Sequence, residues 1–293
     1  MATILDGKQV SKQILEELTE ETTKLAESGI VPGLAAVLIG ENPASRIYVS
    51  SKAKACRKVG FYSEVIERPS DFTQDELLKL IGELNDRRDI HGILVQEPLP
   101  RQLDSLSMIL LMDPAKDVDG FHPVSVGKML LGHDAFIACT PKGIIELLRR
   151  YDIDLSGKHV VVLGRGNIVG KPLSVLLSLK RGANATVTLC HTGTRYVEEY
   201  TKHADVVVAA MGVTEYLKGD MIKDGAVVVD VGINRVDDPS KKRGYRVVGD
   251  VHFESCESKA SYITPVPGGV GPMTIAMLLS NTMQACKSLN NIT

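Results

Sequence analysis

The chain has 293 residues, of which 44% are hydrophobic and 24% charged, with 34 basic and 36 acidic side chains. This length favours two domains, and the ordinary composition excludes a disordered, collagen-like or coiled-coil protein. The net charge of −2 gives no reason to expect a broad nucleic-acid-binding or membrane-binding surface.

The five cysteines favour a reducing compartment. Their number is odd and no two form a CxxC pair, so neither a disulfide framework nor a zinc or redox motif is predicted. The first ten residues, MATILDGKQV, resemble neither a signal peptide nor a transit peptide, and no apolar run is long enough to span a membrane. We therefore expect a cytoplasmic protein without a metal site and without a nucleic-acid or membrane partner.

The first half of the chain alternates between helical and strand patterns. Helical spacing of apolar residues predicts helices at about 7–28, 45–59 and 73–85. Short apolar or alternating runs predict strands at 34–39, 62–67 and 92–95. Such alternation is typical of a mostly parallel sheet covered by helices.

The same rhythm restarts near Thr140, where we place a domain boundary. The predicted helices lie at 141–150 and from about Pro172, and the predicted strands at 158–163, 185–190, 204–210 and 226–231. A loop rich in proline and glycine follows at 264–272, and then a final helix at 273–289. The pattern alone leaves open which domain that helix packs on.

A glycine-rich turn, Gly164-Arg-Gly-Asn-Ile-Val-Gly170, follows the strand at 158–163. Its spacing is GxGxxxG, one residue longer than the usual dinucleotide fingerprint. Glycines let a backbone approach a pyrophosphate, and the helix that follows supplies amide donors. The strand before and the helix after are the context that this motif requires. The alternative is a tight strand–helix turn without a ligand.

No acidic residue follows the next strand, which ends at Cys190. An NAD site usually has one there for the ribose hydroxyl. Arg165 and Thr192 could instead bind a 2′-phosphate, which favours NADP. The alternative is that Arg165 and Arg195 are solvated surface charges.

Tyr48 and Lys52 are four residues apart and share one face of a predicted helix. Such a pair is equally typical of an exposed amphipathic helix. Short-chain dehydrogenases use a Tyr-xxx-Lys helix, but there the nucleotide glycines come first, and here the order is reversed.

Several motifs occur together and in one order. They are Tyr48-Val-Ser-Ser-Lys52, Lys116-Asp-Val-Asp-Gly-Phe-His122, Cys139-Thr-Pro-Lys-Gly143, Val229-Asp-Val-Gly-Ile-Asn234 and Pro267-Gly-Gly-Val-Gly-Pro-Met-Thr-Ile275. With them the chain resembles, over essentially its whole length, the bifunctional methylenetetrahydrofolate dehydrogenase/cyclohydrolase (FolD) family. The last motif is the most specific one.

The resemblance implies a folate enzyme of one-carbon metabolism. NADP⁺ would oxidise 5,10-methylenetetrahydrofolate to 5,10-methenyltetrahydrofolate, and hydrolysis would give 10-formyltetrahydrofolate, a one-carbon donor for purine synthesis. The implied fold is two α/β domains, the second a Rossmann-like doubly wound parallel sheet. Residues 1–139, completed by the returning helix at about 273–289, would bind folate, and residues 140–272 would bind NADP. A homodimer is also implied.

The resemblance further implies roles for single residues. Lys52 would handle the proton and water chemistry of the hydrolysis, Tyr48 would stack on the folate, Gln96 would hydrogen-bond the lysine, and Asp119 would hold the amino-pyrimidine edge. The implied substrate-binding residues are Tyr48, Val49, Ser50, Ser51, Lys52, Val95, Gln96, Glu97, Asp119, Pro267, Gly268, Gly269, Val270 and Gly271. The implied cofactor-binding residues are Gly164, Arg165, Gly166, Thr192 and Ile233.

Two residues depart from the family pattern. Gly166 replaces a serine in the nucleotide turn, which puts cofactor affinity in question. Glu97 replaces an apolar residue after Gln96, and it would weaken the hydrolysis if it faced Lys52. Because neighbouring residues at a strand end face opposite ways, we expect Glu97 to point away from the lysine.

Simpler interpretations stand beside the functional one. Asp117 and Asp119 could be turn residues, Gln96 could cap a loop, and the loop at 265–272 could be a rigid linker. At the level of the whole chain, the alternatives are a single-activity folate dehydrogenase with an idle Lys52 and a folate-binding protein without turnover. Glu97 favours the first alternative, and the intact set of site residues argues against the second.

Overall fold

Each of the two structural units is assembled from two separate stretches of the chain. The computed structural model describes residues 1–241 and 244–292. One unit, called here the glycine-turn unit, consists of Met1–Ser11 and Thr140–Thr274. The other, the lysine unit, consists of Lys12–Cys139 and Ile275–Thr293.

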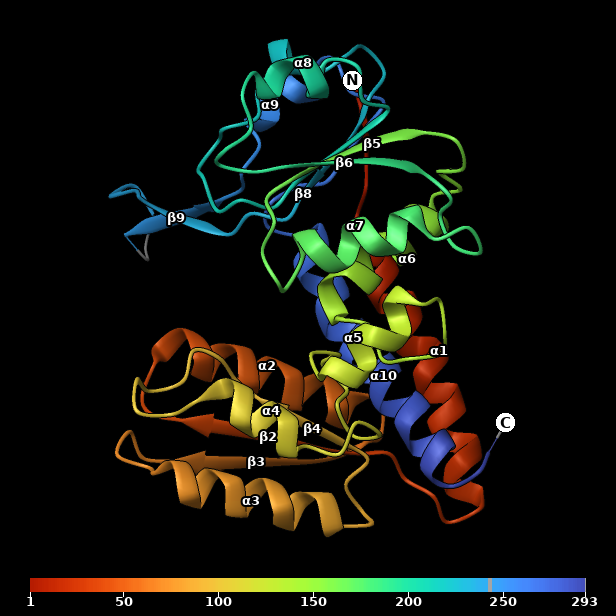
Figure 1. The fold of residues 1–293 in the computed structure, drawn as a ribbon, viewed down its shortest axis with the longest axis vertical. Helices are drawn as coiled ribbons and strands as arrows, with labels where there is room; N and C mark the ends of the chain where they lie inside the picture. The colour runs from red at the N-terminus through yellow and green to blue at the C-terminus, as the bar shows by residue number, and fades with distance from the viewer. Residues whose placement is uncertain (242–243, 293) are drawn as a thin grey trace. The chain divides into compact units, whose positions relative to one another are not determined.

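The lysine unit contains a three-stranded sheet with the order β3-β2-β4, in which both strand pairs are parallel. The strands are β2 (Gly33–Ile39), β3 (Tyr62–Arg68) and β4 (Gly92–Val95), and the short or covering helices are α2 (Pro43–Lys58), α3 (Gln74–Asp86), α4 (Ser105–Leu111) and α5 (Pro123–Leu130). Figure 1 shows α2 and α3 on opposite faces of this sheet. The β–α–β order is what the alternating pattern predicted.

The central strand β2 is buried along its whole length, as its apolar run predicted. Alternate side chains of β2, among them Val37, join apolar residues of α3 and α4 in one core cluster. The helices begin at capping residues: Asn42 accepts hydrogen bonds from two backbone amides of α2, and Thr73 forms a capping box with Glu76 on α3. These caps define the residue at which each helix begins.

The glycine-turn unit contains a six-stranded sheet with the order β1-β11-β8-β7-β5-β6, and all its strand pairs are parallel. The strands are β1 (Thr3–Ile4), β5 (His159–Leu163), β6 (Thr186–Cys190), β7 (Val206–Ala209), β8 (Val227–Asp230) and β11 (Tyr262–Ile263). The helices are α6 (Cys139–Arg150), α7 (Gly170–Ser178), α8 (Val197–Thr201), α9 (Phe253–Glu257) and the 3-10 turn η1 (Gly219–Met221).

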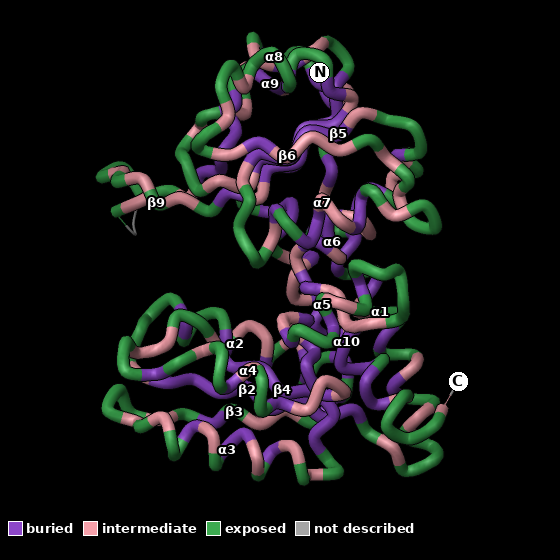
Figure 2. The backbone as a smooth tube through the Cα atoms, in the orientation of Figure 1, coloured by how far each residue is buried: buried purple, intermediate pink, exposed green. Residues whose placement is uncertain are grey.

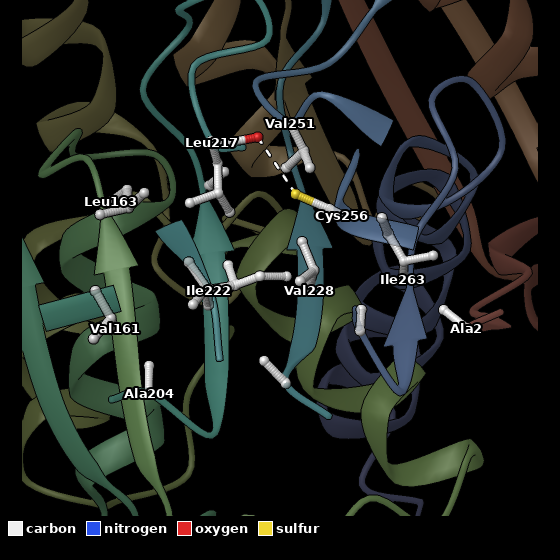
Figure 3. Close-up of a cluster of buried hydrophobic side chains, with 14 of the residues drawn as sticks. Ala2, Val161, Leu163, Ala204, Leu217, Ile222, Val228, Val251, Cys256 and Ile263 are labelled. Carbon is white, nitrogen blue, oxygen red and sulfur yellow. Dashed lines mark hydrogen bonds between the residues drawn. The ribbon is translucent and has the colours of Figure 1, made fainter. Parts of the chain in front are cut away.

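Apolar side chains from both ends of the sequence form the core of this unit. Figure 3 shows Ala2 and Ile263 beside Val228, Val161 and Leu163 in one buried cluster. Figure 2 shows the inner strands of both sheets as buried, whereas the edge strands β3 and β6 are largely intermediate or exposed. A separate antiparallel hairpin, β9 (Asn234–Asp237) with β10 (Tyr245–Val248), extends from this unit in Figure 1.

Two long helices cross the boundary between the units. α1 (Gly7–Glu27) and α10 (Val270–Leu289) each begin in the glycine-turn unit and continue into the lysine unit. There Lys287 forms an ion pair with Glu21 at 3.0 Å. The predicted return of the last helix to the first domain is thereby confirmed. None of the helices in the described ranges is both long and apolar enough to cross a membrane.

The structure adds three features to the predicted elements. Met1–Ser11 joins the second unit rather than the first, because β1 pairs with β11 at the edge of the sheet. The last helix begins at Val270, not at 273, since Pro272 lies in its first turn, where proline needs no amide hydrogen. The hairpin was not predicted, because its polar sequence lacks an apolar alternation.

Candidate functional site

Tyr48 and Lys52 lie one turn apart on α2, as the spacing predicted. Tyr48 is exposed and Lys52 is half-buried. Between and beneath them, Val49 and Ala53 are buried in the lysine unit. The buried side of α2 thus holds the helix on the sheet, while its other side presents the phenol and the amine.

Gln96 lies directly after β4 and contacts the lysine. Lys52 Nζ donates a hydrogen bond of 3.0 Å to Gln96 Oε1. The side-chain amide nitrogen of Gln96 (Nε2) donates a hydrogen bond to the backbone oxygen of Glu97 at 2.8 Å. This second bond sets the orientation of the amide, so its oxygen faces Lys52. The predicted hydrogen bond between Gln96 and the lysine is confirmed.

The Glu97 carboxylate has other partners than Lys52. It accepts hydrogen bonds from Ser105 Oγ at 2.6 Å and from the backbone amide of Leu99 at 2.9 Å. The expectation that Glu97 turns away from the lysine therefore agrees with the structure. Its charge is used to hold the loop that leads to α4.

The two aspartates of the Lys116–His122 motif have different tasks. Asp117 is buried and accepts hydrogen bonds from the backbone amides of Gly120, Phe121 and His122 and from Ser125 Oγ. The interpretation of Asp117 as a turn residue is therefore correct. Asp119 lies within the same turn, but the hydrogen bonds that hold the turn go to the Asp117 side chain. The Asp119 side chain interacts electrostatically with Lys52.

Burial raises the pKa of the Asp119 carboxyl above its usual value. The positive charge of Lys52 and a hydrogen bond with Cys139 act in the opposite direction. The lysine unit thus holds an amine bound to an amide oxygen, and a carboxylate within electrostatic reach of that amine. Together they offer hydrogen-bond acceptors and a proton-exchanging group to a polar ligand.

Residues that the sequence analysis did not select hold this loop in place. Asn281 of α10 is fully buried, and its amide donates to the backbone oxygens of Val118 at 2.8 Å and Ile137 at 2.9 Å. The Lys116 ammonium donates to three backbone oxygens at the end of α3. An asparagine within the apolar run of the last helix was the signal that could have revealed Asn281.

The remaining substrate-binding residues predicted in this unit differ in exposure. Ser50 is exposed, and Ser51 donates to the backbone oxygen of Ile47. Val49 and Val95 are buried, and Val95 belongs to the core cluster with α3 and α4. The side chains of the two valines therefore serve packing, and only their backbone could reach a ligand.

The glycine turn connects β5 to α7, as its sequence context predicted. Gly164 has φ of 107°, and a Cβ built there would lie 2.1 Å from the backbone oxygen of Ala210. A Cβ on Gly170 would lie 1.9 Å from the Gly164 oxygen. Both positions therefore require glycine. Gly166 is different, since a Cβ there would have no neighbour within 4 Å.

Exposed side chains surround this turn at the carboxyl end of the sheet. Arg165 and Thr192 are exposed, and Ile233 is 57% exposed. The loop after β6 is folded by its own hydrogen bonds, from the His191 amide to Thr194 Oγ1 and from the Gly193 amide to His191 Nδ1. The close backbone approach at Gly164 and these exposed donors fit a dinucleotide.

The loop before α10 lies in the glycine-turn unit. Gly268 has φ of 123° and its oxygen accepts a hydrogen bond from the Lys8 amide at 3.1 Å. Gly269 is packed so closely that a Cβ would lie 2.7 Å from Thr264 Cβ. Gly268, Gly269 and Val270 are buried, whereas Pro267 and Gly271 are exposed. The role of this loop at a folate remains a prediction.

Two family models match the chain. The tetrahydrofolate dehydrogenase/cyclohydrolase catalytic domain matches residues 5–119, and the NAD(P)-binding domain of the same family matches residues 138–290. The chain belongs to the tetrahydrofolate dehydrogenase/cyclohydrolase family.

Individual relatives support this family membership over the full length. The bifunctional protein FolD of Chlorobium chlorochromatii (strain CaD3) is 53% identical, over 99% of both chains. The crystal structure of the bifunctional FolD from Campylobacter jejuni has a TM-score of 0.93 and 48% identity, covering 98% of this chain and 99% of that one. The FolD of Trypanosoma brucei, solved with NADP cofactor and an inhibitor, has a TM-score of 0.93 and 41% identity, covering 98% of both chains.

The predicted function is confirmed for this tetrahydrofolate dehydrogenase/cyclohydrolase. The chain is a bifunctional NADP-dependent enzyme of folate one-carbon metabolism, an oxidoreductase and a hydrolase. Neither alternative, the single-activity dehydrogenase or the binding protein, finds support in these relatives. The structure also removes the reason for the first one, since Glu97 is bound to Ser105 and Leu99.

Proposed function

We propose that Lys52 performs the hydrolysis of the methenyl folate and that Gln96 orients it. The observation that carries this proposal is the 3.0 Å hydrogen bond from Lys52 Nζ to Gln96 Oε1. Because Gln96 is fixed by its own bond to Glu97, its oxygen holds one N–H of the lysine in a set direction. The rest of Nζ is then available to exchange protons with the water that attacks the methenyl carbon.

Tyr48 and Asp119 bind the folate in this proposal. The exposed Tyr48 ring offers an apolar face on which a flat pterin can stack. The Asp119 carboxylate is an acceptor, and the amino-pyrimidine edge of the pterin presents hydrogen-bond donors. Asp117 cannot take this role, because its oxygens are occupied by the turn.

Gly164, Arg165, Gly166, Thr192 and Ile233 hold the nucleotide in this proposal. When bound, NADP⁺ accepts the hydride from the methylene carbon. The Arg165 guanidinium and the Thr192 hydroxyl are exposed donors for a 2′-phosphate, and no acidic residue follows β6. These features support a preference for NADP over NAD.

We also propose that the enzyme is a cytoplasmic homodimer. The β9–β10 hairpin is a two-stranded sheet, an arrangement that is only marginally stable unless it packs against something else. All five cysteines are buried thiols outside any disulfide, which fits a reducing compartment. Analytical ultracentrifugation tests the dimer, and a single species of 31.7 kDa would contradict it.

A Lys52→Met variant tests the division of labour. We expect the cyclohydrolase rate with methenyltetrahydrofolate to fall by about 100-fold or more, since acid–base groups contribute that much. Part of the dehydrogenase activity should remain, because hydride transfer depends mainly on placement. Lys54→Met, two residues further along the same helix and exposed, should leave both activities unchanged. Equal loss of both activities in Lys52→Met would refute the proposal.

A parallel assay of the wild type tests the nucleotide assignment. Methylenetetrahydrofolate is mixed with NADP⁺ or NAD⁺, and the reduced nicotinamide and the methenyl product are followed by absorbance. Reduction with NADP⁺ and little methenyl accumulation is expected. A higher kcat/KM for NAD⁺ would contradict the proposed roles of Arg165 and Thr192.

A further inference from the structure

Two buried aspartates lie beneath the loops at the carboxyl end of the six-stranded sheet, and the proposed function uses neither. Asp230 is the last residue of β8, and Asp250 follows the hairpin. They are 4% and 0% exposed. Burying a carboxylate is costly unless hydrogen bonds replace its water, so the partners of both groups decide what they do.

Asp230 binds three backbone amides. Its Oδ1 accepts from Gly232 at 2.9 Å and from Asp250 at 2.8 Å, and its Oδ2 accepts from Val251 at 3.0 Å. The end of β8 is thereby tied to the segment that carries Asp250. The apolar core also holds that segment, because Val251 packs in the core cluster beside Leu217 (Figure 3).

Asp250 joins two other loops. Its Oδ2 accepts from the backbone amides of Met211 at 2.7 Å and Gly212 at 2.8 Å, which follow β7. Its Oδ1 accepts from the Asn234 side-chain amide at 2.9 Å, at the start of β9. One carboxylate therefore connects the loop after β7 with the loop after β8.

Glycines make this close arrangement possible. A Cβ on Gly232 would lie 2.2 Å from Asp250 Oδ1, and a Cβ on Gly249 would lie 1.7 Å from Asp230 Oδ2. Neither glycine can therefore be replaced by a larger residue without disturbing its contact with the carboxylate. The loop after β8 and the segment that carries Asp250 are thus packed closely around these two carboxylates.

The loops that Asp250 binds lie next to two of the residues proposed to bind the nucleotide, Gly164 and Ile233. Ile233 is exposed and lies between Gly232 and Asn234, which are bound to Asp230 and Asp250 respectively. Met211 follows Ala210, whose backbone oxygen excludes any side chain at Gly164. The Asp250 carboxylate thus binds Asn234, the neighbour of Ile233, and Met211, the neighbour of the residue that packs on Gly164.

We propose that Asp250 is a positioning residue for NADP. Its carboxylate, on a backbone fixed by Asp230, holds the loop that carries Ile233 and the Ala210–Gly212 segment that packs against Gly164. Asp250 does not touch the reacting atoms. The inference rests on the proposed assignment of the nucleotide to Gly164 and Ile233.

The test is an Asp250→Asn variant of the full chain, with three measurements. These are the Kd for NADP⁺ by calorimetry, the cyclohydrolase rate without nucleotide, and the unfolding midpoint without nucleotide. Asparagine keeps the shape but places an N–H₂ group where a carboxylate oxygen accepted hydrogen bonds. We expect the Kd to rise about tenfold, which corresponds to about 1.4 kcal/mol. The cyclohydrolase rate should stay within about twofold, because Lys52 lies in the other unit.

Asp205→Asn is a matched control in the same unit. Asp205 also binds a backbone amide, that of His159, together with Lys223, but it precedes β7 at the opposite end of the sheet. We expect a lower unfolding midpoint and an unchanged Kd. If Asp250→Asn does not fold, Asn234→Ala removes the same link from its other side and should raise the Kd about threefold.

The outcomes separate the inference from the function on which it rests. A Kd for Asp250→Asn that rises no more than that of Asp205→Asn, with normal binding by the wild type, would overturn the inference alone. An unchanged Kd in Asn234→Ala would overturn it in the same way. A wild type that does not bind NADP⁺ would overturn the proposed function and the inference with it.

Discussion

The lysine site and the glycine turn are built on opposite principles. At Lys52 the side chains carry the chemistry, and each is oriented by a hydrogen bond to a neighbour, as Gln96 is by Glu97. At Gly164 the backbone itself forms the site, and the absence of side chains is what matters. Substitutions near Lys52 should therefore impair one chemical role at a time, whereas substitutions at Gly164 should impair the site by steric collision with the backbone.

The largest expected effect is that of Gly164→Ala. Its Cβ would meet the Ala210 oxygen at 2.1 Å, and φ of 107° is strained for alanine. We expect NADP-dependent activity to fall by about 100-fold or more, since small displacements of a bound reactant have such effects. Gly166→Ala is the control, because its Cβ would have no neighbour within 4 Å. Similar kcat/KM values for NADP⁺ in both variants would contradict the steric account.

A second prediction concerns the two aspartates of the lysine unit. Asp117→Asn should lower the free energy of unfolding by about 3 kcal/mol, because an amide cannot accept from all four donors around it. Asp119→Asn should cost less than about 1 kcal/mol and instead raise KM for the folate. Urea unfolding and steady-state kinetics measure both variants. Equal destabilisation by the two substitutions would remove the distinction between turn and ligand roles.

A third prediction uses the pH dependence of Asp230. Burial raises the pKa of this carboxyl from 3.8 to about 6; the hydrogen bonds from three backbone amides act against this rise, and the charge of Asp250 adds to it. The folded state then binds more protons than the unfolded state between these values, so stability falls as pH rises through about 6. Between pH 5 and 7.5 the wild type should lose about 1.4 kcal/mol relative to Asp230→Asn. The free energies of unfolding are measured by urea denaturation. The same difference between wild type and Asp230→Asn at both pH values would contradict this prediction.

The smallest expected effect is that of Glu97→Leu. Because its carboxylate binds Ser105 and Leu99, its removal should change the cyclohydrolase rate by less than about twofold. Gln96→Leu, the neighbouring substitution, removes the acceptor of Lys52 and should lower that rate strongly. A large gain of activity in Glu97→Leu would show that its charge does act on the lysine.

Sequence patterns predicted the elements that carry a continuous apolar run or a helical spacing of apolar residues. The strand at Gly92–Val95 and the helix that carries Lys52 are where apolar spacing placed them. The two-residue strands β1 and β11 were beyond such reasoning, since only their pairing with each other and with β8 defines them. The same holds for Asp250, whose importance comes from three loops that meet only in the folded unit.

The pairing of Thr3 with Tyr262 has a consequence for synthesis of the chain. The strand β1 leaves the ribosome first, but its partner is made about 260 residues later. At about 5–20 residues per second, the first strand waits for roughly 13–50 s. During this time the amino end stays unpaired, and the lysine unit is completed later still, because it also needs Ile275–Thr293 at the end of the chain.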